Sequence, residues 1–292
     1  MVPMEFATDR PYVLTASCES RMGTTAAVAT FLAVRRFYIM DMHQFDDTTS
    51  RRFFVRVKFC TVQGEDFDLN LLRTEFASLA NQEGMEWALH DCARKPRVMI
   101  LVSNLDHCLE DLLYRVHTGE LPMEVPGIVS NHPTLKRSAE IHGIPFHHLP
   151  ISAVTKIEQE ARLVALIDET QTELIVLARY MQIFSDAICR KLLGRVINIH
   201  HSFLPSFVGA KPYHQAHARG VKLIGATAHF VTPDLDEGPI IEQVVERVDH
   251  TFTADMLAAW GRDSERRALT TAVKLFLEHR ILLNGERTVI FR

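Results

Sequence analysis

The chain has 292 residues, of which 47% are hydrophobic and 23% are charged, as in ordinary soluble globular proteins. Its formal net charge of -4 gives no sign of a nucleic-acid partner or of an anionic membrane surface as partner. No apolar run reaches the roughly 18 residues that a membrane-spanning helix needs, and the first ten residues lack the basic and apolar regions of a signal peptide. We therefore expect a cytoplasmic protein of two domains.

The cysteines support the same compartment. Five are present, scattered along the chain without a CxxC pair: Cys18, Cys60, Cys92, Cys108 and Cys189. An odd, scattered set argues against a disulfide framework and against a thiolate metal site. We expect a reducing environment and no structural metal.

The first ninety residues predict a small sheet covered by two helices. The patterns of apolar residues indicate, in order, a strand at 12–17, a helix at 24–37, strands at 38–45 and 53–60, a helix at 69–82 and a strand at 87–91. The order β-α-β-β-α-β is ferredoxin-like. Two helices cover one face of such a sheet, and we expect its other face to be available for pairing. The module carries no catalytic cluster, so it serves either docking or dimerisation, or ligand sensing.

A second domain follows an exposed joint at 93–96, which contains a proline beside two cations. We therefore divide the chain into domains 1–93 and 94–292. Strands and helices then alternate, which is typical of an α/β fold with a doubly wound, mostly parallel sheet. The predicted strands are 97–102, 125–130, 145–149, 173–178 and one that begins at Val196, and the predicted helices are 107–116, 133–142, 158–169 and 184–193.

Two features close the second domain. A long helix is predicted over 254–278, packed on the sheet, with its charged middle at 262–267 facing solvent. Asn284-Gly285 then stands between two apolar runs, which is a strong hairpin signal.

The stretch VINIHHSFLP at 196–205 is the best candidate for a site. It opens as a buried strand, then turns polar and ends at a proline. In parallel sheets, ligands bind beyond the carboxyl ends of the strands. Alternation places Asn198 and His200 on one side of the strand and His201 on the other, where it would shape the loop. An amide and an imidazole can both donate to a carbonyl oxygen, and an imidazole can also move protons.

These side chains also have plausible structural roles. Asn198 and His200 could simply cap a strand, and Asp236 could cap the turn in which it lies. Lys211, Tyr213 and His214 either bound the pocket of an acceptor or begin a solvated helix. A zinc site from His200, His201 and Asp236 is disfavoured, because neighbouring residues on one strand do not converge easily on one ion.

The turn after the first strand of the second domain excludes one common kind of site. It reads SNLDHC at 103–108 and contains no glycine. Glycine-rich loops let backbone amides approach a phosphate, as in dinucleotide and nucleoside-phosphate sites. We therefore expect no such site at this turn.

Four ordered motifs resemble those of the formyltransferase family that uses 10-formyltetrahydrofolate. They are NIHHSFLP at 198–205, GAKPYHQA at 209–216, IGATAHFV at 224–231 and LDEGPII at 235–241. The resemblance covers about 97–292. Formyltetrahydrofolate deformylases within this family also begin with an ACT domain of the β-α-β-β-α-β kind, and with that module the resemblance spans nearly the whole chain.

The resemblance implies roles for individual residues. The family's catalytic trio corresponds to Asn198, His200 and Asp236, and His229 matches a histidine beside the catalytic aspartate. Folate contacts are implied for the segment 177–184, largely through its backbone, and for the loop near Asp236. The substrate-binding residues expected on this basis are Met181, Gln182, Ile183, His229, Gly238 and Lys211. Gln182 stands where many members have arginine, which matters little for a main-chain contact.

The motifs also bear on the formyl acceptor. Related glycinamide ribonucleotide formyltransferases carry a GNGSN loop for the acceptor's phosphate, and this chain reads SNLDH at 103–107 instead. Methionyl-tRNA formyltransferases carry SLLPxxRGxxP and an extra basic domain, which this chain does not match. Water is left as the simplest acceptor. The implied reaction is hydrolysis of 10-formyltetrahydrofolate to tetrahydrofolate and formate, within one-carbon metabolism and purine biosynthesis, with the folate as substrate and no tightly bound cofactor.

Alternatives to this hydrolase are a formyltransferase with an amine acceptor and a non-enzymatic folate or amino-acid sensor. Retention of the whole trio argues against the sensor. In ACT domains, the turn after the first strand helps to hold an amino acid at a shared interface. Here that turn reads ESRMG at 19–23, so it has the glycine, Gly23, but lacks the Pro-Asp start that is usual in ACT domains. The resemblance therefore implies a homo-oligomer, a dimer or a tetramer, more strongly than an amino-acid effector.

Overall fold

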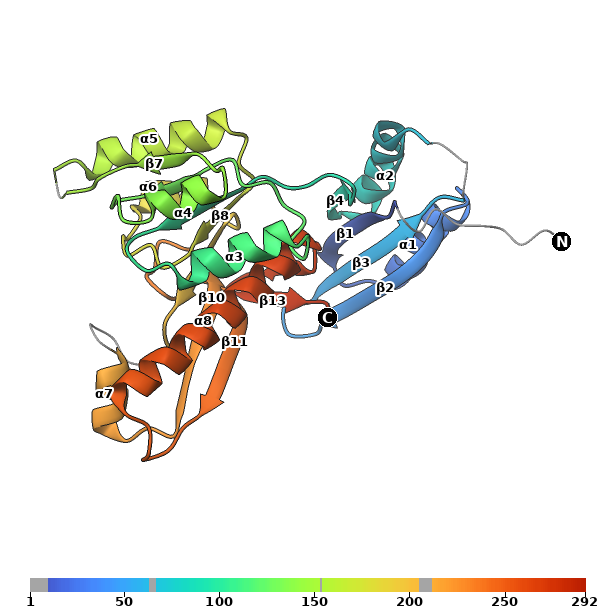
Figure 1. Ribbon diagram of the computed structural model, residues 1–292. Coiled ribbons are helices and arrows are strands. Elements are labelled where there is room, and N and C mark those ends of the chain that lie inside the picture. The colour runs from blue at the N-terminus through green and yellow to red at the C-terminus, as the bar shows by residue number, and fades with distance from the viewer. Residues whose placement is uncertain (1–9, 63–66, 153, 205–211) are drawn as a thin grey trace. The chain divides into compact units, whose positions relative to one another are not determined.

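The computed structural model describes residues 10–62, 67–152, 154–204 and 212–292 (Figure 1). The chain divides into two compact units. The first comprises residues 1–94 together with 278–284 and 289–292, and the second comprises 95–277 and 285–288. The structure thus adds to the first unit a C-terminal segment that the expected division at 93/94 leaves in the second.

The first unit has the predicted β-α-β-β-α-β order. Its elements are β1 (Tyr12–Glu19), α1 (Thr24–Ala33), β2 (Tyr38–Asp47), β3 (Arg52–Cys60), α2 (Leu69–Glu83) and β4 (Glu86–Asp91). The strands form an antiparallel sheet in the order β2-β3-β1-β4. Val28 of α1 and Phe76 of α2 are fully buried against one face of this sheet, together with Leu14 and Val55. The ferredoxin-like prediction is confirmed.

The other face of this sheet is covered in part, contrary to the expectation that it is available for pairing. Phe54 points to that face, is fully buried, and packs with Val289 and Phe291 from the end of the chain. The Arg56 guanidinium donates to the carbonyl of Glu278 at 3.0 Å. The cause lies in the strand itself, since alternation places a large apolar group and a cation on the face that lacks helices.

The covering segment is the predicted hairpin, formed by β12 (Ile281–Asn284) and β13 (Arg287–Ile290). Gly285 lies in its turn with a φ of 62°, the left-handed region in which glycine is unstrained. The amide of Asn284 donates to the Asp47 carboxylate at 2.7 Å, which ties the hairpin to the end of β2. The hairpin prediction is confirmed.

The second unit is built on a seven-stranded sheet in the order β11-β10-β9-β8-β5-β6-β7. The five strands from β9 to β7 are parallel, while β10 runs antiparallel to both β9 and β11. The strands are β5 (Val98–Val102), β6 (Ile128–Ser130), β7 (Phe146–His148), β8 (Leu174–Leu177), β9 (Val196–His200), β10 (Leu223–Phe230) and β11 (Ile240–Arg247). The predicted mostly parallel α/β fold is confirmed.

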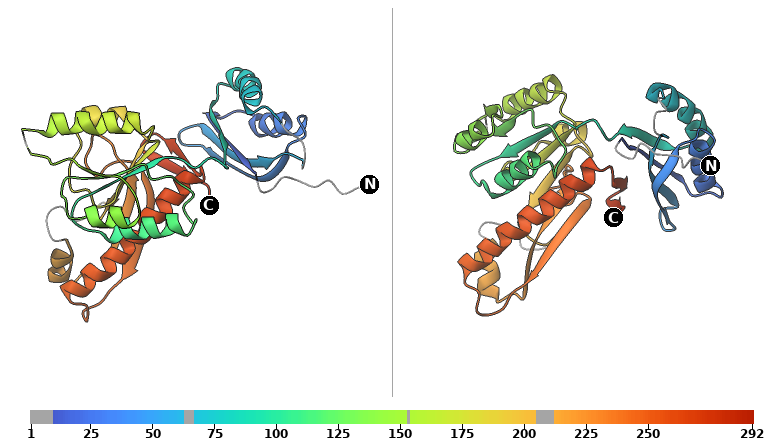
Figure 2. Two further views of the ribbon diagram at one scale, coloured as in Figure 1. Left: turned by 45° about the horizontal axis from the view of Figure 1, so that its top comes forward. Right: turned by 45° about the vertical axis from the view of Figure 1, so that its right-hand side comes forward.

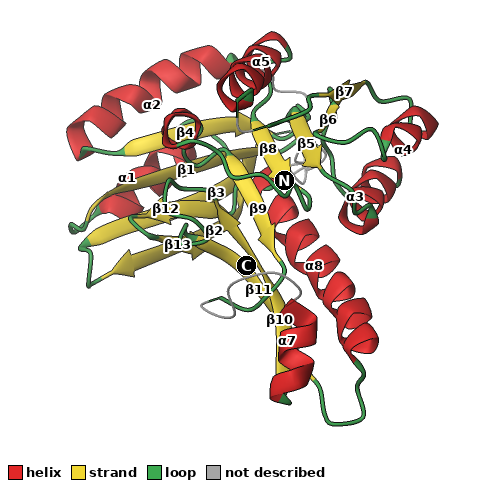
Figure 3. Ribbon diagram, turned by 90° about the vertical axis from the view of Figure 1, so that its left-hand side faces the viewer, coloured by secondary structure: helices red, strands yellow, loops and turns green. Residues whose placement is uncertain are grey.

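Helices cover both faces of this sheet (Figures 2 and 3). The helices are α3 (His107–His117), α4 (Lys136–Ile141), α5 (Lys156–Glu169), α6 (Asp186–Lys191), α7 (Pro212–Arg219) and α8 (Ala254–Leu277). Apolar side chains of α5 and α6 share one core with alternate residues of β5 and β8. On the other side, α8 packs along β9, β10 and β11 and contacts α3 and α7. No helix in the described ranges is long and apolar enough to cross a membrane.

The middle of α8 differs from the prediction that 262–267 faces solvent. Ser264 and Glu265 are each only 1% exposed. Glu265 can be buried because it has polar partners there: His107 and Tyr213 both contact its carboxylate. A buried charge is tolerated when it is paired in this way.

We expect Phe54→Ala to loosen the C-terminal hairpin. Loss of a fully buried phenyl ring costs about 3–5 kcal/mol of unfolding free energy. Hydrogen exchange should therefore accelerate at backbone amides of 281–290 as well as in β3. The control is Leu71→Ala on α2, where the side chain is 56% exposed. Unchanged exchange over 281–290 in Phe54→Ala would show that this ring does not hold the hairpin.

Candidate active site

The register between two strands brings the predicted site residues together. β9 supplies Asn198 and His200, and antiparallel β10 places His229 directly opposite Asn198. β8 runs parallel to β9 with Leu177 beside Asn198, so both strands end at the same edge of the sheet. The side chains therefore gather beyond the carboxyl ends of parallel strands, as expected for a ligand site.

The loop from β10 to β11 brings in the carboxylate. Gly238 lies so close to β10 that a Cβ atom there would overlap the carbonyl oxygen of Phe230. Without this glycine the loop could not fold back on the strand. Asp236 itself has a φ of 58°, a left-handed conformation that aspartate adopts more readily than most residues. This tight return aims the Asp236 side chain at the histidines of β9 and β10.

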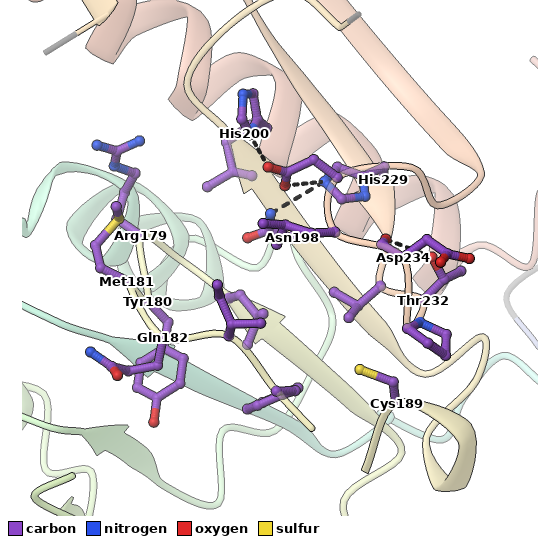
Figure 4. A pocket seen from close by; sticks show the side chains of 18 of the residues that line it. Arg179, Tyr180, Met181, Gln182, Cys189, Asn198, His200, His229, Thr232 and Asp234 are labelled. Atoms are coloured by element: carbon purple, nitrogen blue, oxygen red, sulfur yellow. Dashed lines mark hydrogen bonds and ion pairs between the residues drawn. The ribbon is translucent and has the colours of Figure 1, made fainter. Parts of the chain in front are cut away.

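Asp236 lies between two imidazoles, those of His200 and His229, which are labelled in Figure 4. Its Oδ2 atom is 3.2 Å from His200 Nδ1, and its Oδ1 atom is 3.6 Å from His229 Nε2. Interaction with His200, and then with His229, outweighs burial and lowers the pKa of Asp236 well below its usual range. The carboxylate is therefore ionised at neutral pH, where it can orient an imidazole or accept a hydrogen bond from water.

Asn198 is oriented through His229. The ring nitrogen Nδ1 of His229 lies 2.9 Å from the Phe230 carbonyl oxygen, to which it donates. The other ring nitrogen, Nε2, lies 3.2 Å from the Asn198 amide nitrogen and 3.6 Å from Asp236 Oδ1. His229 is only 2% exposed, and its contacts with Asn198 and Asp236 fix how these two side chains lie.

One atom of the site remains available for chemistry. His200 Nε2 is buried and has no hydrogen-bond partner among the residues that the structure describes. Because Nδ1 of the same ring faces Asp236, Nε2 is the nitrogen that a bound substrate would meet. An imidazole held by a carboxylate on one side can donate or accept a proton on the other.

A cavity of about 290 Å³ opens beside these residues. Its walls come mainly from the segments after β8, at the end of β9 and after β10. The lining residues are Leu177, Arg179, Tyr180, Met181, Gln182, Ile183, Phe184, Cys189, Asn198, Ile199, His200, His201, His229, Val231, Thr232, Pro233, Asp234, Leu235 and Asp236. The cavity thus adjoins all three proposed catalytic side chains.

Several of the expected substrate-binding residues lie at this cavity. Met181, Gln182 and Ile183 belong to an irregular segment after β8, and the side chains of Met181 and Ile183 are each 59% exposed. Such a segment offers backbone groups to a ligand. Gly238 is not among the lining residues. Its role is to let the loop from β10 to β11 pass close to β10, which positions Asp236. Lys211 lies outside the described residues.

His201 differs from the expectation that it points away from His200. The two rings stack with centroids 4.8 Å apart, and both line the cavity. The reason is that β9 ends at His200, so the alternation of side chains stops there. Burial, and then the nearby charges of Arg179 and His200, lower the pKa of His201 to about 4. His201 is therefore a neutral neighbour of the His200 imidazole.

A second set of polar side chains lies beside the cavity, and the sequence patterns do not predict it. His107, Cys108 and Glu265 are close enough for their side chains to hold a metal ion. The chemistry fits an ion poorly, because the Arg179 guanidinium lies 3.4 Å from the Glu265 carboxylate and supplies positive charge there. Burial also raises the pKa of Cys108 well above its usual value, whereas a metal ligand must be a thiolate.

Comparison with known proteins shows the family to which the chain belongs. A family model for formyl transferases matches residues 96–273. Formyltetrahydrofolate deformylase of a Corynebacterium species is 51% identical over 281 residues, which cover 96% of this chain and 98% of that protein. The Escherichia coli K12 protein of the same name is 38% identical over 278 residues, covering 95% of this chain and 97% of the relative.

Solved structures show the same relationship. The crystal structure of formyltetrahydrofolate deformylase from Burkholderia mallei is 55% identical, covers 97% of this chain and all (100%) of that chain, and superposes with a TM-score of 0.93. A glycinamide ribonucleotide transformylase from Symbiobacterium toebii is 31% identical with a TM-score of 0.63, and covers 68% of this chain and 95% of that chain. The chain therefore belongs to the formyl transferase family and, within it, to the formyltetrahydrofolate deformylases.

Proposed function

We propose that this protein hydrolyses 10-formyltetrahydrofolate to tetrahydrofolate and formate. The observation that carries the proposal is the meeting of Asn198, His200 and Asp236 at a cavity, in a chain similar over nearly its whole length to deformylases. In the reaction, a water oxygen forms a bond with the formyl carbon and the bond from that carbon to N10 breaks. One water proton goes to N10, and the formic acid formed releases its proton as formate.

The first requirement is to stabilise the negative charge that develops on the formyl oxygen. Asn198 can donate through its amide and His200 through Nε2, the buried atom without a partner among the described residues. Donors fixed before the reaction stabilise such an oxyanion strongly, because they need not reorganise. The contacts of Asn198 with His229 and of His200 with Asp236 provide this fixation.

The second requirement is to move the proton of the attacking water. Asp236 orients the water and takes its proton, directly or through His200. The lowered pKa of Asp236 keeps the carboxylate ionised and ready to accept. Because of the same low pKa, the Asp236 carboxylate holds the proton only weakly. The proton therefore passes to N10 as the bond from N10 to the formyl carbon breaks.

The folate ring is held by the other end of the cavity. Backbone groups of 181–184 and the loop 232–235 line that end. Tyr180, directly before the first segment, and Phe184, at its end, are 4% and 8% exposed and belong to the apolar core that α5 and α6 share with the sheet. A flat heterocycle with several hydrogen-bonding edges suits such a site, which is mostly apolar with a few polar groups.

We further propose that the first unit assembles a homo-oligomer, a dimer or a tetramer, and is the place where an amino-acid effector would bind. Strand β2 is ten residues long and lies at an edge of the sheet, with Phe45 46% exposed. Exposed edge strands offer unpaired backbone groups to a second chain.

A cytoplasmic location fits the five free thiols.

Purified protein incubated with 10-formyltetrahydrofolate alone should release formate, without added amine or metal. The physical reason is that the site contains groups for oxyanion stabilisation and for proton transfer. Formate and tetrahydrofolate are measured together, and a chelator should leave the rate unchanged. Formate release that requires an amine would establish a transferase, and no turnover of any kind would favour a sensor. Zinc-dependent recovery after chelation would refute metal-free chemistry.

Substitution of the trio should separate catalysis from binding. Asp236→Asn keeps the shape of the side chain but should lose at least about 10³ in turnover, because the amide takes no proton. His200→Asn should lose a similar factor and the double variant little more, since groups that act as a unit are not additive. Asn198→Ala should cost about 10², as one oxyanion donor among several. His201→Asn should cost less still.

Turnover and folate affinity of these variants are measured separately, and melting temperatures confirm folding. Near-normal activity in Asp236→Asn would overturn the mechanism. A lost affinity with intact turnover at saturation would make Asp236 a binding residue instead.

The mass in solution tests the role of the first unit. Light scattering should give two or four times the 33.2 kDa chain mass for the native protein. Phe45→Lys should shift the population towards the single chain, because a charge on an edge strand opposes strand pairing. Leu71→Lys on α2 is the control and should leave the mass unchanged. A single-chain mass for the native protein would refute the assembly.

A further inference from the structure

The carboxylate of Glu265 is the centre of a buried polar cluster beside the catalytic site. Glu265 is 1% exposed, in the middle of α8. His107 Nε2 lies 2.8 Å from its Oε2 atom, the Tyr213 hydroxyl donates to Oε1 at 2.9 Å, and Arg179 Nε lies 3.4 Å from Oε2. We call these four side chains the Glu265 cluster. They come from α3, the segment after β8, α7 and α8, so four elements meet at one carboxylate.

The cluster is closely packed as well as charged. The ring of Tyr213 occupies the space in which a side chain at Gly261 would lie, so only glycine fits at that turn of α8. Burial, and then the charge of Glu265, raise the pKa of Tyr213 well above its usual value, which keeps its hydroxyl a donor. Burial alone would raise the pKa of Glu265, but the hydrogen bond from His107 and the charge of Arg179 outweigh it and lower that pKa.

Arg179 connects the cluster to the cavity. It contacts Glu265 and also lines the cavity, close enough to the ring of His201 for its charge to affect that residue's pKa. Arg179 has a φ of 65°, so its backbone turns in the left-handed region directly after β8. Its side chain is only 12% exposed. The cluster therefore lies directly behind the cavity wall formed by Arg179 and His201.

Arg179 and His201 border the part of the cavity that the proposed folate position leaves open. In the proposed function, the folate ring occupies the end lined by 181–184 and 232–235, and the formyl group lies at Asn198, His200 and Asp236. An acceptor then reaches the formyl carbon from the remaining end, at Arg179 and His201. Water needs little room there, whereas an amine carries its own substituent and needs a channel.

We propose that the Glu265 cluster fills the acceptor channel and thereby makes water the acceptor. The inference rests on the proposed hydrolysis and adds the residues that select water. Both reactions form one bond to the formyl carbon and break its bond to N10. With water the products are formate, a proton and tetrahydrofolate. With an amine, the nitrogen gives its proton to N10, and the products are the N-formyl amine and tetrahydrofolate.

Product partition tests this role. The full-length protein is incubated with 10-formyltetrahydrofolate and either hydroxylamine or glycinamide, and formate and the formylated amine are both quantified. The native protein should give almost only formate. Arg179→Ala, which removes the wall, and Glu265→Ala, which removes its anchor, should each raise the ratio of formylated amine to formate by at least about tenfold, the scale of discrimination that a filled space provides.

Two controls separate shape from other effects. Glu265→Gln keeps the volume of the side chain and should change the ratio less than Glu265→Ala does. Arg137→Ala, at an exposed position on α4, should leave the ratio at the native value. A ratio is independent of the fraction of protein that is folded. His107→Ala opens the cluster from the side of α3. It replaces Arg179→Ala or Glu265→Ala if melting curves show that one of these two variants does not fold.

An unchanged ratio in the opened variants, with formate still released, would overturn the inference and leave the hydrolase standing. Failure of the native protein to release formate from 10-formyltetrahydrofolate alone would instead refute the proposed function.

Discussion

The whole site depends on one ionised carboxylate held against two imidazoles. Asp236 faces His200 on one oxygen and His229 on the other, and these contacts keep its pKa well below the usual range. His200 Nε2 is buried and has no hydrogen-bond partner among the described residues, and His229 contacts Asn198. Removal of the carboxylate would take away the partner of His200 Nδ1, whereas His229 would keep its hydrogen bond to the Phe230 carbonyl oxygen.

The fold is arranged to deliver that carboxylate. The register of β9 and β10 makes Asn198 and His229 cross-strand neighbours, and the close return at Gly238 brings Asp236 back over them. A one-residue slip in register would turn Asn198 and His200 to the opposite face of the sheet. Site and sheet are therefore specified together, which explains why short motifs from distant parts of the chain suffice to identify them.

Much of this arrangement could be predicted, because it follows from local patterns of apolar and polar residues in the sequence. The alternation around Asn198 and His200 and the polar turn at Asp236 are visible in the chain, as are the strands and helices of both units. His201 was placed wrongly because alternation was carried past the last residue of the strand. The prediction that Glu265 faces solvent rests on its charge alone, although Gly261 and Leu269 stand four residues from it and Leu257 eight, and these three mark the buried face of α8.

Other features could not be read from local patterns. The burial of Phe54 by Phe291 joins residues separated by most of the chain, and no periodicity reports such a partner. The contacts at Glu265 likewise join four segments that are distant in the sequence, so no local pattern indicates them. In our proposal, these side chains select the acceptor without contacting the reacting atoms.

In the proposed reaction, water attacks the formyl carbon directly and Asp236 acts on its proton. A single turnover in water enriched in oxygen-18 distinguishes this reaction from attack by the carboxylate, with the mass of the formate as readout. Direct attack predicts formate that carries one oxygen-18 atom, with none incorporated into the protein. Unlabelled formate, with the label in the Asp236 carboxylate, would contradict the account, since the carboxylate would then have attacked the formyl carbon itself.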